Sequence, residues 1–208
     1  MTDRDDDPQY QVRKELKAHK KERILETATR LFYESGFRAT SMESIADELS
    51  ATKPFIYYHF KNKYDLLEEI ALRVTGLANG ALEAAIQVDA DPGAVLANMV
   101  RNYSRLVLER KRIVAVFWRE ASNFTENTKE RVEKERLRFT SALAEVLREG
   151  NARGVFEVDQ PALTALAIMN LITFTYTWQH DNGELTQEDL CDQFVKLTLR
   201  MVVTKTQD

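Results

Sequence analysis

The sequence has little of the chemistry that marks disulfide-bonded, metal-binding or β-rich proteins. Its 208 residues include one cysteine, Cys191, which excludes an internal disulfide framework and a cysteine-rich metal site. Seven glycines and four prolines leave few interruptions, so we expect long elements joined by short turns. Strong helix formers dominate and no sustained period-two alternation occurs, which favours an all-α fold of about nine helices.

Leader, membrane and polyanion-binding signals are also missing. The first residues, MTDRDDDPQY, are acidic and lack the apolar core of a signal peptide. The longest apolar run, ALTALAIMNLITFTYTW, is interrupted by Thr and Asn, so we interpret it as a buried helix rather than a membrane span. A cytoplasmic location is therefore expected. The net charge of −4 argues against a general polyanion binder, and only a local basic surface would make nucleic acid a partner.

Catalytic motifs are absent too. None of His19, His59 and His180 has a glutamate three positions earlier, as a di-iron helical bundle requires. The sequence contains no His-Glu-x-x-His, no Gly-x-Ser-x-Gly and no phosphate-binding glycine loop. We therefore expect no enzymatic activity, no cofactor and no metal site.

The first third of the chain is organised around short helices. We expect a disordered acidic tail over residues 1–12, a domain of short helices over 13–65 and a larger helical domain over 66–208. The run VRKELKAHKKER concentrates positive charge, as a basic surface or as an ordinary solvated helix start. After it, apolar residues recur at helical spacing from Ile24 to Phe32, and Gly36 is expected to end that helix.

Two further helices follow at very short spacing. Thr40 and Glu43 form a predicted capping box at the start of the first of these helices, and Thr52 is predicted to cap the second. Asn62 with Asp65 is predicted to cap a longer, fourth helix. Two helices joined by so short a turn must cross steeply, since no room is left for an antiparallel arrangement. This spacing is typical of a helix-turn-helix motif.

The stretch TKPFIYYHF, residues 52–60, has an unusual density of aromatic and polar groups. On a helix, Ile56 and Phe60 face inward, which leaves a cluster of aromatic, basic and hydroxyl groups exposed. The major groove of DNA fits such a cluster, since it offers acceptors to lysine and thymine methyl groups to an aromatic ring. In the alternative interpretation the aromatic rings pack the small three-helix core. Phosphate oxygens are the expected partners of the remaining polar groups: Thr40, Ser41, Tyr57, Tyr58 and His59.

Residues 24–67, ILETATRLFYESGFRATSMESIADELSATKPFIYYHFKNKYDLL, resemble the DNA-binding domain of the TetR/AcrR family of bacterial transcriptional regulators. The likeness rests on Gly36-Phe37, Thr40-Ser41, Ile45-Ala46, the Tyr57–Phe60 run, Lys63 and Leu66-Leu67. It implies a recognition helix over Thr52–Tyr58, with Lys53, Pro54, Phe55 and Tyr57 nearest the bases, and a backbone-contacting set of Thr40, Ser41, Tyr58, His59 and Lys63.

Two positions depart from that family pattern. The turn usually carries glycine where this chain has Ser50, and a left-handed backbone there costs serine about 1 kcal/mol. Phe55 stands where the family often has a small residue, which suggests a distinctive operator preference.

The last two expected helices carry apolar residues on two faces, which predicts burial on both sides. One face serves the core of the chain, and the other meets a second subunit or the interior of a monomer. Members of the family dimerise through their last two helices, so the resemblance implies a homodimer and a palindromic operator. The predicted interface residues are Leu163, Ile168, Ile172, Leu190, Phe194, Leu197 and Met201.

Family members bind a small molecule inside the C-terminal bundle and lose affinity for DNA, so the resemblance implies a ligand-responsive repressor. The predicted ligand contacts are Tyr103, Arg105, Phe117, Trp118, Arg119, Phe139, Asn170, Phe174 and Trp178. Within the family, the Trp118–Glu120 run, the Gly154 turn, Met169-Asn170 and Trp178 resemble the branch that responds to acyl-CoA thioesters of lipid, steroid or aromatic-acid catabolism. The alternative is a regulator of an efflux system that binds drug-like amphipathic compounds. The operator, the effector and the choice between repression and activation stay open.

Overall fold

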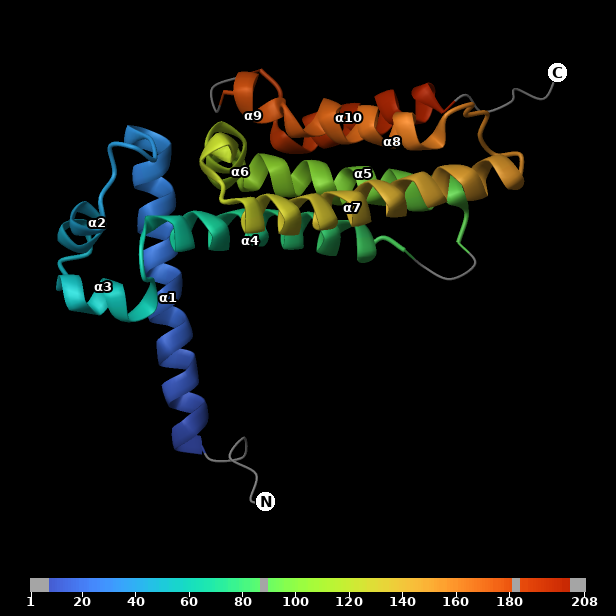
Figure 1. The fold of residues 1–208 in the computed structure, drawn as a ribbon. Coiled ribbons are helices and arrows are strands. Elements are labelled where there is room, and N and C mark those ends of the chain that lie inside the picture. The colour runs from blue at the N-terminus through green and yellow to red at the C-terminus, as the bar shows by residue number, and fades with distance from the viewer. Residues whose placement is uncertain (1–7, 87–89, 181–183, 203–208) are drawn as a thin grey trace. The chain divides into compact units, whose positions relative to one another are not determined.

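The computed structural model describes residues 8–86, 90–180 and 184–202. Helices and turns account for these ranges, which contain no strand, so the all-α prediction is confirmed (Figure 1). The α-helices run from α1 to α10, and α9 (Thr175–Trp178) is a single turn, in keeping with the expected number. None of the described helices combines the length and apolar composition needed to cross a membrane.

The chain divides into two compact units. The first comprises Met1–Ile70 and Val116–Thr125, and the second comprises Ala71–Ala115 and Glu126–Asp208. The first unit thus ends a few residues beyond the expected boundary at 65. It also includes 116–125, a segment that the sequence analysis had assigned to the C-terminal domain.

The first unit contains α1 (Pro8–Ser35), α2 (Met42–Glu48), α3 (Lys53–His59) and the first residues of α4 (Lys63–Glu83). Helix α1 begins within the expected disordered tail, at a proline that a first helical turn tolerates; residues 1–7 lie outside the described ranges. It ends at Gly36, whose φ of +83° suits glycine and whose N–H donates to the Phe32 carbonyl at 3.0 Å.

The capping of α2 differs from the expected pattern. Ser41, not Thr40, is the N-cap: its hydroxyl accepts the Ser44 N–H and the Ser44 hydroxyl accepts the Ser41 N–H, each at 3.0 Å. Thr40 lies one residue before the cap, and its hydroxyl donates to the Gly36 carbonyl at 2.9 Å. Thr52 does stand at the N-cap of α3, although its side chain makes no capping hydrogen bond.

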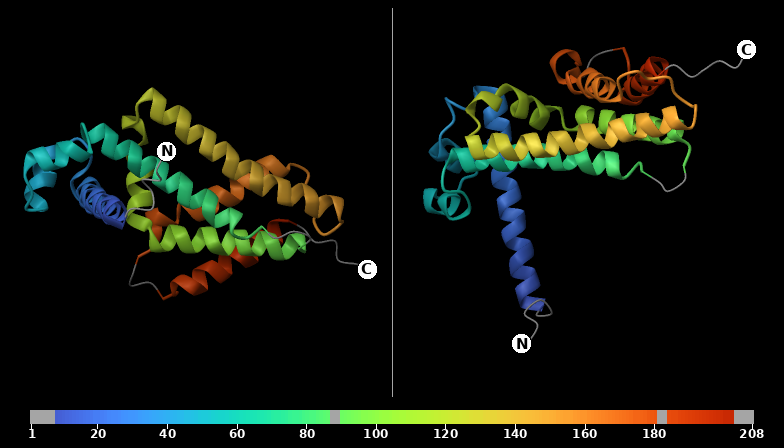
Figure 2. Two further views of the ribbon diagram at one scale, coloured as in Figure 1. Left: turned by 90° about the horizontal axis from the view of Figure 1, so that it is seen from below. Right: turned by 45° about the vertical axis from the view of Figure 1, so that its right-hand side comes forward.

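The second unit is a helical bundle around α5 (Pro92–Glu109). This helix contacts α7 (Glu126–Ala152), α8 (Pro161–Thr173), α9 and α10 (Gln187–Met201), an arrangement that can be followed in the two views of Figure 2. Asp91 caps α5 by accepting the Ala94 N–H, and Thr186 and Asp189 form a capping box at the start of α10.

A glycine of α7 and the course of helix α6 complete the description of the two units. Gly150 near the end of α7 has no room for a side chain, because an added Cβ would lie 1.9 Å from the Phe156 ring. Helix α6 (Lys111–Arg119) begins in the second unit and ends in the first, where a short 3-10 helix, Ala121–Asn123, follows it.

Candidate nucleic-acid interface and effector core

Helix α3 presents a polar and aromatic face to solvent. Ile56 and Phe60 are buried, as predicted, whereas Tyr57 is 46% and Tyr58 is 71% exposed. Lys53, Thr52 and Pro54 are exposed at the start of the same helix. Rings of this size stay in water only at a cost in free energy, so the exposed face of α3 has the character of a binding surface.

Lys53 is held by α2 in the free protein. Its Nζ lies 3.3 Å from Oε1 of Glu43, and both side chains are well exposed. A backbone hydrogen bond within Glu43, followed by its contact with Lys53, lowers the pKa of that carboxyl. A fully exposed ion pair of this kind is weak, so it orients Lys53 without preventing the ammonium from leaving for a stronger partner.

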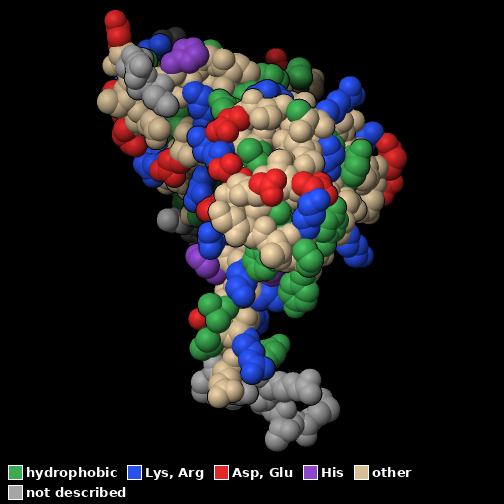
Figure 3. All heavy atoms as spheres, turned by 90° about the vertical axis from the view of Figure 1, so that its left-hand side faces the viewer, with side chains coloured by type: hydrophobic (Ala, Val, Ile, Leu, Met, Phe, Trp, Pro, Cys, Tyr) green, Lys and Arg blue, Asp and Glu red, His purple; other side chains and the backbone are tan. Residues whose placement is uncertain are grey.

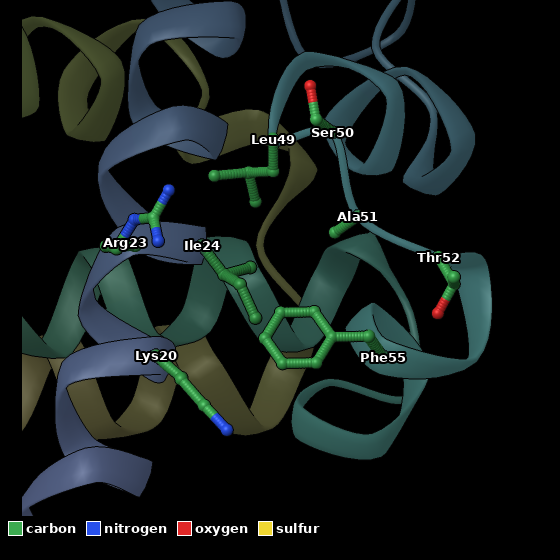
Figure 4. A pocket seen from close by; sticks show the side chains of 8 residues that line it. All are labelled: Lys20, Arg23, Ile24, Leu49, Ser50, Ala51, Thr52 and Phe55. Carbon is green, nitrogen blue, oxygen red and sulfur yellow. The ribbon is translucent and has the colours of Figure 1, made fainter.

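Phe55 turns toward α1, and the His59 ring lies between it and Tyr58, 5.0 Å from the Tyr58 ring. The Phe55 and His59 rings meet edge to face at 5.2 Å, and both are half-buried. Figure 4 shows the Phe55 ring directed at Ile24 and Lys20, where it lines an open pocket of about 370 Å³. A contact between Phe55 and a thymine methyl group therefore stays a prediction that requires the ring to move.

Two of the predicted phosphate-binding residues are engaged inside the first unit. Thr40 is only 3% exposed, so its hydroxyl cannot reach a phosphate in this conformation. The Lys63 ammonium donates to the carbonyls of Phe37, Arg38 and Thr40 at 2.9, 3.3 and 3.1 Å. It also lies 4.5 Å from the centroid of the Phe37 ring. Lys63 thus fixes the loop before α2 by hydrogen bonds to its carbonyls.

Ser50 adopts the left-handed conformation that the sequence analysis associated with glycine. Its φ is +51°, and the neighbouring Ala51 N–H donates to the Ala46 carbonyl at 2.9 Å. The turn between α2 and α3 is therefore built as in glycine-containing turns, with serine carrying the strain of about 1 kcal/mol.

Phe117, Trp118 and Arg119, predicted to contact ligand, lie in the first unit. Phe117 is buried against Trp118 and Phe124, with ring centroids 5.2 and 5.6 Å away. Arg119 donates to the Tyr33 carbonyl at 3.3 Å. Next to it, Glu120 accepts the Phe37 N–H at 3.2 Å, a contact that sequence reasoning missed. This segment therefore holds the end of α1.

Tyr103 and Phe139 do come together, in the core of the second unit. Their ring centroids are 4.7 Å apart, and both line a narrow apolar space of about 10 Å³ that we call the effector seam. The other lining residues are Leu82, Met99, Val100, Leu143, Ile168, Met169 and Ile172. Sequence reasoning missed most of them because an apolar residue that lines such a space looks like any core residue.

The effector seam contains one hydrogen-bonding side chain, Tyr103. The Tyr103 hydroxyl lies 2.6 Å from the Thr173 hydroxyl, which itself donates to the Met169 carbonyl at 2.7 Å. Because a hydroxyl has one hydrogen, Tyr103 is the donor to Thr173. Burial raises the pKa of Tyr103 to about 12, so its hydroxyl keeps its proton and its hydrogen bond to Thr173.

The remaining predicted ligand residues lie away from the effector seam. Arg105 is exposed and pairs with Glu188, its Nη2 3.1 Å from Oε2. Asn170, Phe174 and Trp178 are exposed as well. Their contact with an effector stays a prediction.

The predicted dimer residues fall into two groups. Ile168, Ile172, Leu190 and Phe194 are buried within their own unit. Leu163, Leu197 and Met201 are exposed, with Leu163 at 64%, and Leu171 and Phe174 add further exposed apolar surface on the α8 side.

Comparisons with known proteins agree with this architecture. Residues 24–70 match the sequence model of bacterial regulatory proteins of the tetR family, and residues 89–202 match that of the tetracyclin repressor-like C-terminal domain. The chain is 25% identical over 176 residues to the uncharacterised HTH-type transcriptional regulator YhgD of Bacillus subtilis, covering 82% of this chain and 90% of that protein. It is 22% identical over 184 residues to the HTH-type transcriptional repressor KstR2 of Mycolicibacterium smegmatis, with coverages of 88% and 90%.

Among solved structures, AibR in complex with isovaleryl coenzyme A and operator DNA superposes with a TM-score of 0.76. That likeness extends over 86% of this chain and 97% of AibR, at 26% sequence identity. The likeness includes both units rather than the helix-turn-helix segment alone.

Proposed function

The chain belongs to the tetR family of bacterial regulatory proteins, and we propose that it is a repressor that binds a palindromic operator as a homodimer and is released by an acyl-CoA thioester. As a member of this family the chain is a DNA-binding transcriptional regulator and not an enzyme. The observation that carries the proposal is the exposed surface of α3, where Lys53, Tyr57 and Tyr58 are exposed while Ile56 is buried.

In the proposed complex, α3 lies in the major groove. Lys53 reaches acceptors on the base edges, with Pro54 and Tyr57 beside it, while Tyr58, His59 and Ser41 contact the sugar–phosphate backbone. One such helix makes few contacts, and affinity falls steeply with salt when it depends on phosphate contacts. A two-fold dimer doubles the contacts and requires a palindromic site.

The exposed apolar residues of α8 and α10 support the dimer. Leu163, Leu171, Leu197 and Met201 are exposed in the isolated chain, and packing against a second copy would remove them from water. Two helices from each protomer then form a four-helix bundle. A protein that sediments as a single protomer at micromolar concentration would contradict this part of the proposal.

The effector seam supports a ligand that is apolar and carries one hydrogen-bond acceptor. An acyl chain separates the apolar side chains of the seam, and its thioester carbonyl replaces Thr173 as the acceptor for Tyr103. The AibR structure with isovaleryl coenzyme A supports this ligand class. For release from DNA, the ligand must bind the DNA-incompetent conformation more tightly than the competent one.

The DNA-binding part is tested by selecting duplexes from a random library with the purified protein and titrating the selected duplex. Lys53→Ala should weaken specific binding by about 1–3 kcal/mol and relax the preference at one base position. Lys129→Ala, on α7 of the second unit, removes the same charge and should leave the preference intact. If Lys53→Ala and Tyr57→Ala both bind the selected duplex as the wild type does, the assignment of α3 as the recognition helix fails.

The effector part is tested by thermal shift and by release from the selected duplex. Isovaleryl-CoA, a long-chain acyl-CoA and a steroid-derived acyl-CoA are compared with their free acids and with CoA alone. A thioester should stabilise the wild type and release DNA, and Tyr103→Phe should weaken the response by about 1 kcal/mol, the free energy of one hydrogen bond. A stronger effect of the free acids would eliminate the acyl-CoA assignment and leave the DNA-binding assignment intact.

A further inference from the structure

The N-terminal half of α1 has a surface that the proposed function does not use. It lies upstream of residue 24, where the match to the tetR-family DNA-binding segment begins. At about 100° per residue, five basic side chains fall within an arc of about 120°, and Glu15 and Glu22 fall on the opposite side. We call four of them the α1 basic face: Arg13, Lys14, Lys17 and Lys20, all exposed. The fifth, Lys21, is neutralised by Glu69 at 2.9 Å.

The α1 basic face adjoins the recognition helix. The Lys17 ammonium lies 5.4 Å from the centroid of the Tyr58 ring, and the Lys20 ammonium lies 6.0 Å from that of Phe55. Figure 3 shows Lys and Arg side chains along the N-terminal part of α1, in the lower part of the view. The positive charge is therefore continuous with the side of α3 that carries the exposed Tyr58.

Between the two helices the surface is open. The 370 Å³ pocket has an apolar floor that includes Ile24 and Leu49, and Lys20 and Arg23 lie on its α1 side (Figure 4). Neither cation is covered by the first unit. Lys20 and Arg23 thus remain open to solvent beside the start of α3.

The cations of the α1 basic face differ from several cations of α7 in lacking an acidic partner within the described parts of the chain. On α7, several basic side chains pair with glutamates three residues earlier, as in Arg136–Glu133 at 2.7 Å and Lys129–Glu126 at 2.6 Å. Across residues 8–86, 90–180 and 184–202, no ion pair involves a member of the α1 basic face. In water, the mutual repulsion of these like charges does not stabilise the helix. A polyanionic partner would neutralise the charge of the α1 basic face.

We propose that the α1 basic face binds the sugar–phosphate backbone of the operator beside the segment read by α3. The inference rests on the proposed DNA-binding function and extends it beyond the helix-turn-helix motif. From Lys20 to Arg13 the helix rises about 10 Å, which corresponds to about three base pairs of B-DNA. Phosphate contacts add affinity and carry no sequence information, so this face strengthens binding to every duplex alike.

The test is the salt dependence of DNA binding by an Arg13→Gln, Lys14→Gln, Lys17→Gln variant. Glutamine is a good helix former, so α1 should stay helical, which circular dichroism checks. Each lost phosphate contact lowers the magnitude of the slope of log K against log salt by about 0.9, so a dimer that loses one contact per protomer changes by about 2. Affinity for a selected and for a scrambled duplex should fall by the same factor.

Two further variants make the result specific. Lys129→Gln, Arg131→Gln, Lys134→Gln removes the same charge from α7 and should leave the slope unchanged. Arg13→Lys, Lys14→Arg, Lys17→Arg keeps the charge and should keep the wild-type slope, whether or not the glutamine variant folds. The inference is overturned if the glutamine variant has the same salt slope as the α7 control. It is also overturned if the charge-retaining variant has a smaller salt slope than the wild type. Wild-type protein that does not distinguish the selected from the scrambled duplex instead overturns the proposed function.

Discussion

The recognition face of α3 and the effector seam are built in opposite ways. The face belongs to a helix of seven residues, in which Tyr57 and Tyr58 are exposed while Ile56 and, just after the helix, Phe60 occupy the core. The seam is an interior contributed by α4, α5, α7 and α8, whose lining is almost entirely apolar. In the first site polar groups are displayed before the partner arrives, whereas in the second they become accessible only when packed side chains separate.

This difference predicts how each site responds to substitution. Residues of an exposed face contribute to binding and little to the free energy of unfolding, whereas residues of a closed interior contribute to both. The predictions below test that separation, beginning with the substitution for which we expect the largest effect.

Phe139→Ala should lower the free energy of unfolding by about 3–5 kcal/mol, because Phe139 is 4% exposed and packs on Tyr103. Phe55→Ala, in the open pocket beside α3, should lower it by about 1 kcal/mol or less. Urea unfolding followed by circular dichroism measures both. Equal losses for the two phenylalanines would contradict the distinction between a closed seam and an open face.

Lys63→Met should lower the free energy of unfolding by about 1.5–3 kcal/mol, since it removes a charged donor from three carbonyls while keeping the apolar stem near Phe37. DNA affinity should fall for all sequences with an unchanged salt slope, because the loop before α2 is loosened. Lys61→Met, two residues earlier and exposed, is the matched control. A slope reduced by about 1 would show instead that Lys63 contacts a phosphate, as the sequence analysis predicted.

The sequence predicted the first unit better than the second for a physical reason. The burial of Ile56 and Phe60 and the helix end at Gly36 depend on neighbours within a few residues, so local spacing was sufficient. The contacts of Lys63 were not foreseen because its three carbonyl partners lie 23 to 26 residues away, and no local pattern encodes them.

The lining of the effector seam depends in the same way on packing among four helices. Aromatic and charged residues such as Trp118 and Arg105 stand out in a sequence, whereas isoleucines and methionines at helical spacing look like any other core residues. The chemistry of a largely apolar site is therefore visible only after the helices have been packed together.

Ser50→Gly should raise the free energy of unfolding by up to about 1 kcal/mol. The φ of +51° is strained for serine and natural for glycine, although glycine's greater freedom in the unfolded chain offsets part of the gain. Thermal unfolding measures the change. Ser35→Gly, at the exposed last residue of α1, is the control and should destabilise the protein slightly, because no left-handed backbone is relieved there. An unchanged or lower melting temperature for Ser50→Gly would show that the serine side chain compensates the strain.

The smallest expected effect is a change in the pKa of His59, a residue of α3 that lies near the lysines of α1. Burial first, and then Lys17, Lys20 and Lys21, lower the pKa of His59 below its ordinary value of 6.5. The unfolded chain therefore binds more protons than the folded one between the lowered pKa and 6.5. The stability that neutral His59 contributes is fully present above that window and is lost as the pH falls through it.

Lys17→Gln should raise the pKa of His59 part of the way back toward its ordinary value, since the repulsion of one ammonium is removed while burial remains. Addition of duplex DNA to the wild type should raise it in the same direction, because phosphates neutralise the lysines. Both changes are measured by NMR titration of the imidazole, with Lys129→Gln as the control. A His59 pKa that does not respond to Lys17→Gln would mean that burial alone sets it, and a pKa that ignores DNA would place the phosphates away from this edge of α3.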